Sequence, residues 1–293
     1  MLDYRGIEAL YTVLEFQSFE AAAKKLHITQ SAVSQRVKGL EIGYGEPLLI
    51  RVQPYQLTAV GKQLITHYKK ICLLEADLSK NLGSTPKPHI AIALNRDSIE
   101  TWFLDLISEN KGFFDAIQLE LIADDQELTI DYLKNGRVSA CLSTTQKEIL
   151  GGDCVFVGNM DYRLVATPDF IEKYFKKKGA EALKEAPAIK FDRNDHMLED
   201  YSAEYFGLNG QEINYYVMPS VRGFKQFIKQ GIAYGLIPSI ELEQEDLVEI
   251  FPQKIWTIPF YWHYWSVQSP FYQRFNTEMI GHIKAKLRYT HSE

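Results

Sequence analysis

The sequence predicts an α/β protein with an all-α head at the amino terminus and a two-lobed body behind it. Three observations predict this class. Apolar residues recur at helical spacing over most of the first 81 residues. Strand and helix patterns alternate from His89 onward, and the strand patterns fall into two clusters. We expect the head over residues 1–58, a linker helix and hinge over residues 59–88, and the body over residues 89–293.

The charge of the chain is divided unevenly between these parts. Residues 1–89 hold 11 basic and 8 acidic residues, which gives +3. The remaining residues hold 21 basic and 30 acidic residues, which gives −9, within a formal net charge of −6. A basic head on an acidic body favours a head that faces DNA.

The sequence favours a cytoplasmic location. The first residues, MLDYRGIEAL, lack a basic segment followed by an apolar run, so we expect no export signal. No stretch of about 18 apolar residues occurs, so we expect no membrane partner. The three cysteines lie far apart, which indicates buried thiols in a reducing compartment and not a disulfide framework.

Two short helices joined by a tight turn are predicted within the head. Residues 3–16 carry the apolar spacing of a first helix, and Ser18 can cap a second helix over residues 20–26. His27 and Ile28 form the turn, and Thr29 can cap a third helix. The second and third helices therefore predict a helix-turn-helix.

The third helix has an apolar face and an unusual polar face. Val33, Val37 and Leu40 form one apolar stripe. The opposite face carries amides and hydroxyls, which can match the donors and acceptors of bases in the major groove. The residues that we expect to contact DNA here are Thr29, Gln30, Ser31, Ser34, Gln35, Arg36 and Lys38. The alternative is an exposed face of a plain three-helix bundle.

A wing and a long helix follow the third helix. Residues 47–51 and 55–57 predict two very short strands, and Arg51 is placed to contact a phosphate or a minor groove. Thr58 can cap a helix over residues 59–81, whose apolar stripe includes Leu64 and Ile71. Nothing else in the sequence covers this stripe, so we expect a homodimer through it. GSTPKP, residues 83–88, predicts a hinge.

The body predicts two lobes of mostly parallel strands. HIAIAL, IQLELIA, VSACLS and CVFVGN predict the first cluster of strands, and RLVAT, AIKFD, EINYYVM and GIAYGLIP predict the second. Residues 98–110, 126–135 and 221–230 predict helices between them, and residues 271–288 predict a closing helix. The aromatic run FYWHYW, residues 260–265, is more typical of a buried strand than of a cofactor site.

Polar residues at strand ends predict a ligand site between the lobes. Ligands in open α/β folds bind at the carboxyl ends of strands. Hydroxyls and a helix amino terminus on one lobe, which can hold a carboxylate, would face carboxylates on the other lobe. This arrangement suits an amino acid with a cationic side chain. The residues in question are Asn95, Asp97, Ser98, Asp124 with Asp125, Ser143, Thr144, Asp192 and Asp195.

Each of these groups also has a purely structural interpretation. Ser143 and Thr144 can serve only their loop, Asp192 and Asp195 can cap the helix that follows, and Asp124 can be a surface turn residue. Enzyme interpretations are weaker still. The chain has no G-x-S-x-G, no glycine-rich phosphate loop and no H-E-x-x-H. We therefore predict no catalytic residues, no metal ligands and no cofactor.

Three ordered segments resemble one family. FEAAAKKLHITQSAVSQRVKGLE, then PLLIR, then LTAVGKQL resemble the LysR-type transcriptional regulators. One departure is that VQPY, residues 52–55, lacks the second arginine that the wing of this family often carries. The resemblance implies a winged helix-turn-helix DNA-binding domain, a two-lobed periplasmic-binding-protein-like effector domain, and a double-stranded DNA partner. It also implies a homodimer or tetramer, with RNA polymerase as a further candidate partner.

The wing, NRDSIETW and FDRNDHM look like one branch of that family. This branch senses arginine and lysine, controls amino-acid export and related genes, and has also been named for inhibiting chromosome initiation. It implies L-lysine or L-arginine as the effector, and an effect on genes of amino-acid transport or metabolism. Three alternatives stay open: a regulator of this type that senses another metabolite, an architectural DNA-binding protein that inhibits replication initiation, and a transport-type solute-binding protein.

Overall fold

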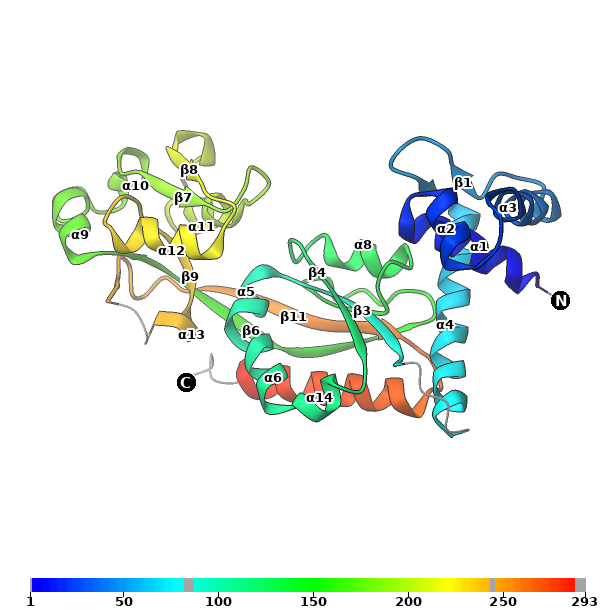
Figure 1. Ribbon diagram of the computed structural model, residues 1–293. Helices are drawn as coiled ribbons and strands as arrows, with labels where there is room; N and C mark the ends of the chain where they lie inside the picture. Colours follow the sequence, from blue (N-terminus) through cyan, green and yellow to red (C-terminus); the bar gives the residue numbers. More distant parts are fainter. Residues whose placement is uncertain (1, 82–86, 243–245, 288–293) are drawn as a thin grey trace.

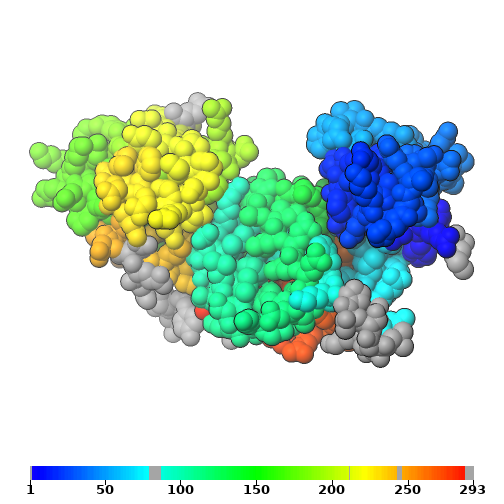
Figure 2. Space-filling view, viewed as in Figure 1, coloured from blue at the N-terminus to red at the C-terminus, as the bar shows by residue number. Residues whose placement is uncertain are grey.

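The computed structural model describes residues 2–81, 87–242 and 246–287, and these form three parts (Figure 1). The helical head lies at one end, a first lobe lies in the middle, and a second lobe lies at the other end (Figure 2). Most of the predicted hinge, residues 83–88, lies outside the described residues.

Three helices and a small wing form the head. Their bounds are Tyr4–Phe16 for α1, Phe19–Lys25 for α2, Gln30–Tyr44 for α3, Leu49–Ile50 for β1 and Gln56–Leu57 for β2. The predicted caps are confirmed: Ser18 Oγ accepts the N–H of Ala21 at 3.2 Å, and Thr29 Oγ1 accepts the N–H of Ala32 at 3.1 Å. His27 adopts a φ of 56° in the turn, a left-handed conformation that lets the chain reverse sharply.

The linker helix α4 (Ala59–Asn81) is partly covered by its own head. We expected its apolar stripe to have no other surface. This is wrong for Leu64 and Ile65, which are buried in the core of the head because α4 packs against α1. Farther along, Leu74 and Leu78 are 40% and 59% exposed. Among the described side chains of this helix, the exposed part of the stripe around Leu74 and Leu78 is therefore the part left for a second copy of the chain.

The same helix attaches the head to the first lobe. Lys69 Nζ donates to the carbonyl oxygen of Arg137 at 3.0 Å. One residue later, Lys70 Nζ donates to the carbonyl oxygen of Gly151 at 2.9 Å. The head and the first lobe are therefore linked by side chains of α4 as well as by the chain itself.

The first lobe contains parallel strands with helices on both faces. The strands are β3 (His89–Leu94), β4 (Gln118–Ala123) and β5 (Ala140–Ser143), with β3 in the middle. The helices are α5 (Arg96–Ser98), a π-helical segment (Ile99–Phe103), α6 (Leu104–Glu109), α7 (Lys111–Phe114), α8 (Thr129–Lys134) and α14 (Pro270–Leu287). Helices α6 and α14 cover one face of the sheet and α8 covers the other (Figure 1). Trp102, Trp262 and Phe275 are buried in the core between them.

Two long strands join the lobes. β6 (Gly152–Ala166) runs from the first lobe into the second, and β11 (Trp256–Trp265) pairs antiparallel with it and runs back into the first lobe (Figure 1). β11 is antiparallel to β5 as well. The prediction of mostly parallel strands is therefore wrong, and residues 154–159 and 163–166, expected in two strands, belong to one. The aromatic run is the predicted buried strand, with Phe260 and Trp262 fully buried.

The second lobe is built around the far end of β6. Its strands are β7 (Ala188–Lys190), β8 (Tyr215–Val217), β9 (Gly235–Pro238) and β10 (Val248–Glu249). β7 and β8 are parallel to each other, whereas β9 and β10 pair antiparallel with β6. The helices are α9 (Pro168–Tyr174), α10 (Ala182–Glu185), α11 (Met197–Phe206), α12 (Val221–Lys229) and α13 (Ser239–Leu242).

Candidate functional site

The polar face of α3 points away from the core of the head. Val33, Val37 and Leu40 are buried, as predicted. On the opposite side, most of the predicted contact residues are exposed, whereas Ser34 and Arg36 are half-buried. The exposed ones are Thr29, Gln30, Ser31, Gln35 and Lys38. The face is therefore free for a large partner, with the oxygen of Thr29 already used as the helix cap.

Arg51 lies at the base of the wing and is held by the head itself. Its Nη2 lies 3.0 Å from Glu41 Oε2, and its guanidinium lies 5.8 Å from the ring centroid of Phe19. Glu41 also accepts the N–H of Leu48 at 3.1 Å. The Arg51 side chain remains 54% exposed, so a phosphate could share its guanidinium with Glu41.

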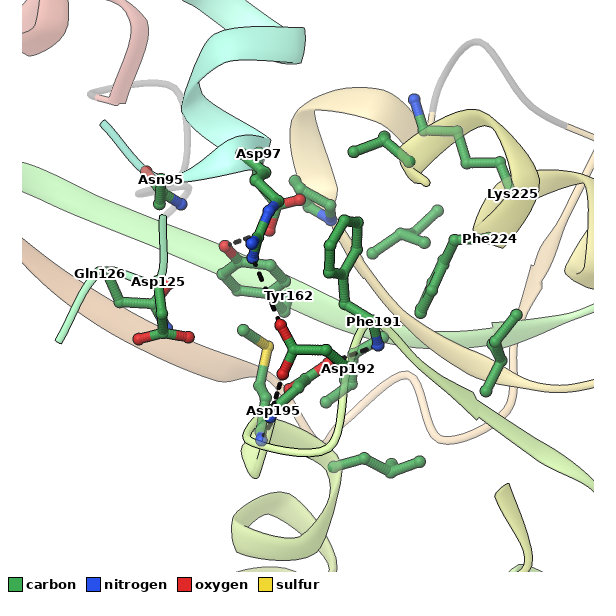
Figure 3. A pocket seen from close by; sticks show the side chains of 18 of the residues that line it. Asn95, Asp97, Asp125, Gln126, Tyr162, Phe191, Asp192, Asp195, Phe224 and Lys225 are labelled. Atoms are coloured by element: carbon green, nitrogen blue, oxygen red, sulfur yellow. Dashed lines mark hydrogen bonds and ion pairs between the residues drawn. The ribbon is translucent and has the colours of Figure 1, made fainter. Parts of the chain in front are cut away.

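A second candidate site is a cavity between the two lobes, which we call the cleft (Figure 3). Its polar lining residues are Asn95, Arg96, Asp97, Asp124, Asp125, Gln126, Tyr162, Asp192, Asp195, Lys225 and Glu241. Its apolar lining residues are Ile189, Phe191, Met197, Leu198, Val221, Phe224, Leu236, Ile237 and Pro238. Among these described residues, six carboxyl groups face two cationic groups, so the cleft favours a cation.

The first-lobe wall contains an unsatisfied amide beside a carboxyl group. Asn95 is 2% exposed, and neither its Oδ1 nor its Nδ2 has a hydrogen-bond partner among the described residues. Asp97 Oδ2 accepts the hydroxyl of Tyr162 at 2.7 Å, and the two side chains face each other in Figure 3. Burial raises the pKa of Asp97 to about 6, and the hydrogen bond from Tyr162 opposes the rise. A bound cation would relieve the cost of this buried charge.

Asp124 lies on the same wall, and its carboxylate accepts one hydrogen bond from its own loop and one from Tyr132. Its Oδ1 accepts the N–H of Asp125, and its Oδ2 accepts the hydroxyl of Tyr132. Asp124 lines the cleft, so it is not simply a surface turn residue, which was the structural alternative for it.

The second-lobe wall presents a loop that two carboxylates organise. Asp192 Oδ1 accepts the N–H groups of Asn194 and Asp195, at 2.8 and 3.1 Å. Asp195 accepts the N–H of Phe191 at 2.9 Å and that of Met197 at 3.2 Å. Both carboxylate oxygens of Asp195 therefore accept backbone N–H groups. In Asp192, among the described residues, only Oδ1 does so, and Oδ2 faces the cleft. Burial raises the pKa of Asp195.

Lys225 and Glu241 close the far side of this wall. Lys225 Nζ lies 2.5 Å from Glu241 Oε1, and both side chains are largely buried. Phe224 and neighbouring apolar residues lie beside this pair in the cleft. An apolar surface of this kind can cover the aliphatic part of a ligand.

The structure brings together six of the nine residues named for the ligand site. Those that line the cleft are Asn95, Asp97, Asp124, Asp125, Asp192 and Asp195.

The other three lie outside the cleft. Ser98 is fully buried behind the wall, with no partner for its Oγ among the described residues. Ser143 is fully buried and donates to the carbonyl oxygen of Gln126 at 3.0 Å. Thr144 lines a neighbouring depression together with Asn194. Ser143 and Thr144 lie at the end of β5. β11 pairs with the edge of that strand, opposite Ser143.

Several polar lining residues were not predicted, namely Arg96, Gln126, Tyr162, Lys225 and Glu241. Arg96 and Gln126 adjoin predicted residues, so the strand-end rule could have found them. Tyr162 lies inside the long strand β6, and Lys225 and Glu241 lie on separate helices. No local signal distinguishes these three.

The described residues offer little for other kinds of site. No group of three or more His, Cys, Asp or Glu side chains that could hold a metal ion occurs among them. In the same part of the chain, no helix is long and apolar enough to cross a membrane.

Both parts of the chain match models of one family. Residues 4–62 match the bacterial regulatory helix-turn-helix protein of the lysR family, and residues 83–275 match the LysR substrate binding domain. The chain belongs to the LysR family of transcriptional regulators. The resemblance seen in the sequence is thereby confirmed, and so is the fold class of a winged helix-turn-helix head with a two-lobed effector domain. The architectural and solute-binding alternatives each account for only one of these two matches.

Three relatives show how far the similarity to this LysR-type regulator extends. The transcriptional regulator ArgP of Vibrio cholerae is 35% identical, over 98% of each chain. The structure of ArgP from Mycobacterium tuberculosis has a TM-score of 0.82 at 28% identity, covering 97% of this chain and 98% of that one. Full-length LysG from Corynebacterium glutamicum with bound effector Arg has a TM-score of 0.76 at 27% identity, covering 96% of this chain and 98% of that one.

Proposed function

We propose that this LysR-type regulator binds L-arginine or L-lysine in the cleft, and that binding changes how it holds DNA at genes of amino-acid transport or metabolism. The observation that carries the proposal is the acidic lining of the cleft around the buried amide of Asn95, which has no hydrogen-bond partner in the part of the chain that the structure describes. The similar LysG structure has arginine as its bound effector, which supports the same class of ligand.

Each part of such an amino acid has a counterpart in the cleft. Asn95 Nδ2 can donate to the α-carboxylate, a role expected from the sequence for hydroxyl groups such as those of Ser98 and Thr144. Asp97 can accept the α-ammonium group, and Asp124 or Asp192 can face the cationic end of the side chain. The apolar wall around Phe224 would cover the aliphatic stem. A charge pair in a closed cleft has lost its water, so removing either of its two charged groups weakens binding strongly.

The head would make the contacts with DNA. Gln30, Ser31, Ser34 and Gln35 would read base edges, and Arg51 would contact a phosphate. A second copy would pair through the exposed part of α4 around Leu74 and Leu78. Two-fold symmetry then requires a pseudo-palindromic site with half-sites about one helical turn, or a multiple, apart. Tetramer formation and contact with RNA polymerase stay predictions.

Calorimetry with matched ligands tests the effector. L-arginine and L-lysine should bind the full-length protein, and L-citrulline, which replaces the guanidinium by a neutral urea group, should bind more weakly. The loss of one charge from a desolvated pair costs about 2–5 kcal/mol, so the affinity should fall at least about 25-fold. Heat with an acidic or aromatic metabolite, together with none for arginine or lysine, would refute the effector and leave the regulator standing.

A further inference from the structure

Arg96 reaches from the first lobe to the second lobe across the cleft. It is the first residue of α5, yet its guanidinium lies 4.3 Å from the ring centroid of Phe191, which follows β7. Its Nη1 lies 3.7 Å from Asp192 Oδ2, and Figure 3 shows this carboxylate between the two walls. One side chain of the protein therefore connects both walls of the cleft.

We propose that Arg96 is a tethered competitor of the effector, whose guanidinium occupies the subsite for the cationic end of the ligand and so sets the affinity of the cleft. The inference rests on the proposed function, because it takes the effector to be cationic. A planar guanidinium that stacks on an aromatic ring and faces a carboxylate is the arrangement by which proteins hold arginine side chains. Phe191 and Asp192 already provide this arrangement.

Within the second lobe, the local shape of the subsite is set by hydrogen bonds that do not involve Arg96. Backbone N–H groups of Asn194 and Asp195 fix Asp192 Oδ1, which aims Oδ2 at the cleft. Phe191 is fixed in turn, because its own N–H is bonded to Asp195. A ligand that displaces Arg96 would therefore find the carboxylate and the ring already in place, with little further ordering needed.

Arg96 itself is held weakly enough to leave. Its side chain is 31% exposed and that of Asp192 is 37% exposed, and ion pairs at such exposure contribute little because water and salt screen them. After displacement, Arg96 has Asp124 and Asp125 on its own lobe to face, since both line the same cleft. The competition therefore lowers the effector affinity without abolishing it.

In the effector-free protein, the contact between Arg96 and Asp192 also affects how the two lobes lie. The cleft brings carboxylates of both lobes toward each other, and a cation between them offsets their repulsion. Arg96 supplies that cation, so it keeps the Asp192 loop near the first lobe. An amino acid that enters replaces one cation by another and adds its own α-carboxylate and α-ammonium groups. Affinity for the effector is then reduced by the fraction of molecules in which Arg96 occupies the subsite.

Calorimetry on full-length Arg96→Ala and Arg96→Met, with L-arginine and L-lysine, tests the competition. Arg96→Met keeps an unbranched stem over Phe191 and lacks the charge, so it guards against a packing defect. Both variants should bind L-arginine about tenfold more tightly than the wild type, as expected when a partly exposed ion pair and a cation–π contact no longer compete. The matched control is Arg193→Ala, which removes an exposed arginine from the same loop and should leave the affinity unchanged.

Weaker binding by both variants would overturn the proposal, because Arg96 would then contact the effector directly. Unchanged binding would overturn it as well. If neither the wild type nor the variants bound either amino acid, the proposed function would fail, and a second measurement then decides on Arg96. Amide hydrogen exchange of the effector-free proteins should be faster over residues 191–197 in Arg96→Ala and Arg96→Met than in Arg193→Ala. Equal exchange rates would show that Arg96 does not hold this loop.

Discussion

Replacing Asp97 with asparagine should stabilise the effector-free protein and weaken effector binding at the same time. Burial raises the pKa of Asp97 from 3.8 to about 6, with smaller contributions of the same sign from Glu241 and Asp195. The folded protein therefore holds this carboxylate at a cost. Asparagine has the same shape and still accepts the hydroxyl of Tyr162, but it carries no charge, so the cost disappears.

The magnitude follows from the size of the pKa shift. A rise from 3.8 to about 6 is about two pKa units, and each unit corresponds to 1.36 kcal/mol. Above pH 6 the variant should thus gain about 3 kcal/mol in free energy of unfolding. Between pH 3.8 and 6 the folded wild type binds a proton that the unfolded chain has released. The stability of the wild type therefore falls as the pH rises through this window, and the advantage of the variant grows with it.

Effector binding should change in the opposite direction. A cationic group of the effector pairs with the ionised carboxylate, so Asp97→Asn should weaken L-arginine binding at least about 25-fold. In the wild type, the affinity should fall about tenfold for each pH unit below the pKa of Asp97, because the effector then competes with a proton. Above that pKa, the affinity should be flat.

Urea denaturation at pH 7.5 and pH 5.5, together with calorimetry for L-arginine, measures both effects. Asp115→Asn is the matched control, because Asp115 is exposed and lies outside the cleft. A lower free energy of unfolding for Asp97→Asn at pH 7.5 would refute the argument from burial. If Asp97→Asn bound L-arginine as tightly as the wild type does, the role of Asp97 in binding would be refuted, while the argument from its pKa would stand.

Three further predictions concern DNA binding and assembly. Gln30→Ala should weaken binding to the operator by about 1–3 kcal/mol and binding to random DNA much less; equal losses on both would demote this side chain to a positioning role. Arg51→Ala should reduce the slope of log affinity against log salt by about 1, as expected for one lost phosphate contact, and an unchanged slope would argue that its guanidinium serves only Glu41. Leu78→Glu should give monomers in sedimentation experiments, whereas the equally charged change Gln63→Glu at another exposed position on α4 should not. A dimer that survives Leu78→Glu would place the interface elsewhere.

The head illustrates how much of the structure local sequence can predict. Ser18, Thr29 and Thr58 cap α2, α3 and α4 as expected. A cap depends on hydrogen bonds to N–H groups two or three residues away, so the sequence contains all of the interacting groups. The same holds for the buried stripe of Val33, Val37 and Leu40, which follows from helical periodicity alone.

The cleft illustrates where such reasoning stops. Ser143 and Thr144 follow a strand and carry suitable hydroxyls, but β11 covers that strand on the side away from β3. Tyr162 reaches Asp97 only because β6 continues from one lobe into the other. Local strand patterns could not reveal either fact, because both depend on how β6 and β11 pair.

By itself, the sequence determined the helix-turn-helix, its caps, the polar face of α3 and the strand-end carboxylates, because each depends on neighbours within one or two turns or on the alternation of a single strand. Only the tertiary structure decided the mixed sheet, the burial of Leu64 and Ile65 by α1, and the contact between Arg96 and Asp192. The last two residues lie far apart in the chain. Their contact depends on how closely two lobes approach, which is the sum of many packing contacts and is not encoded in either segment alone.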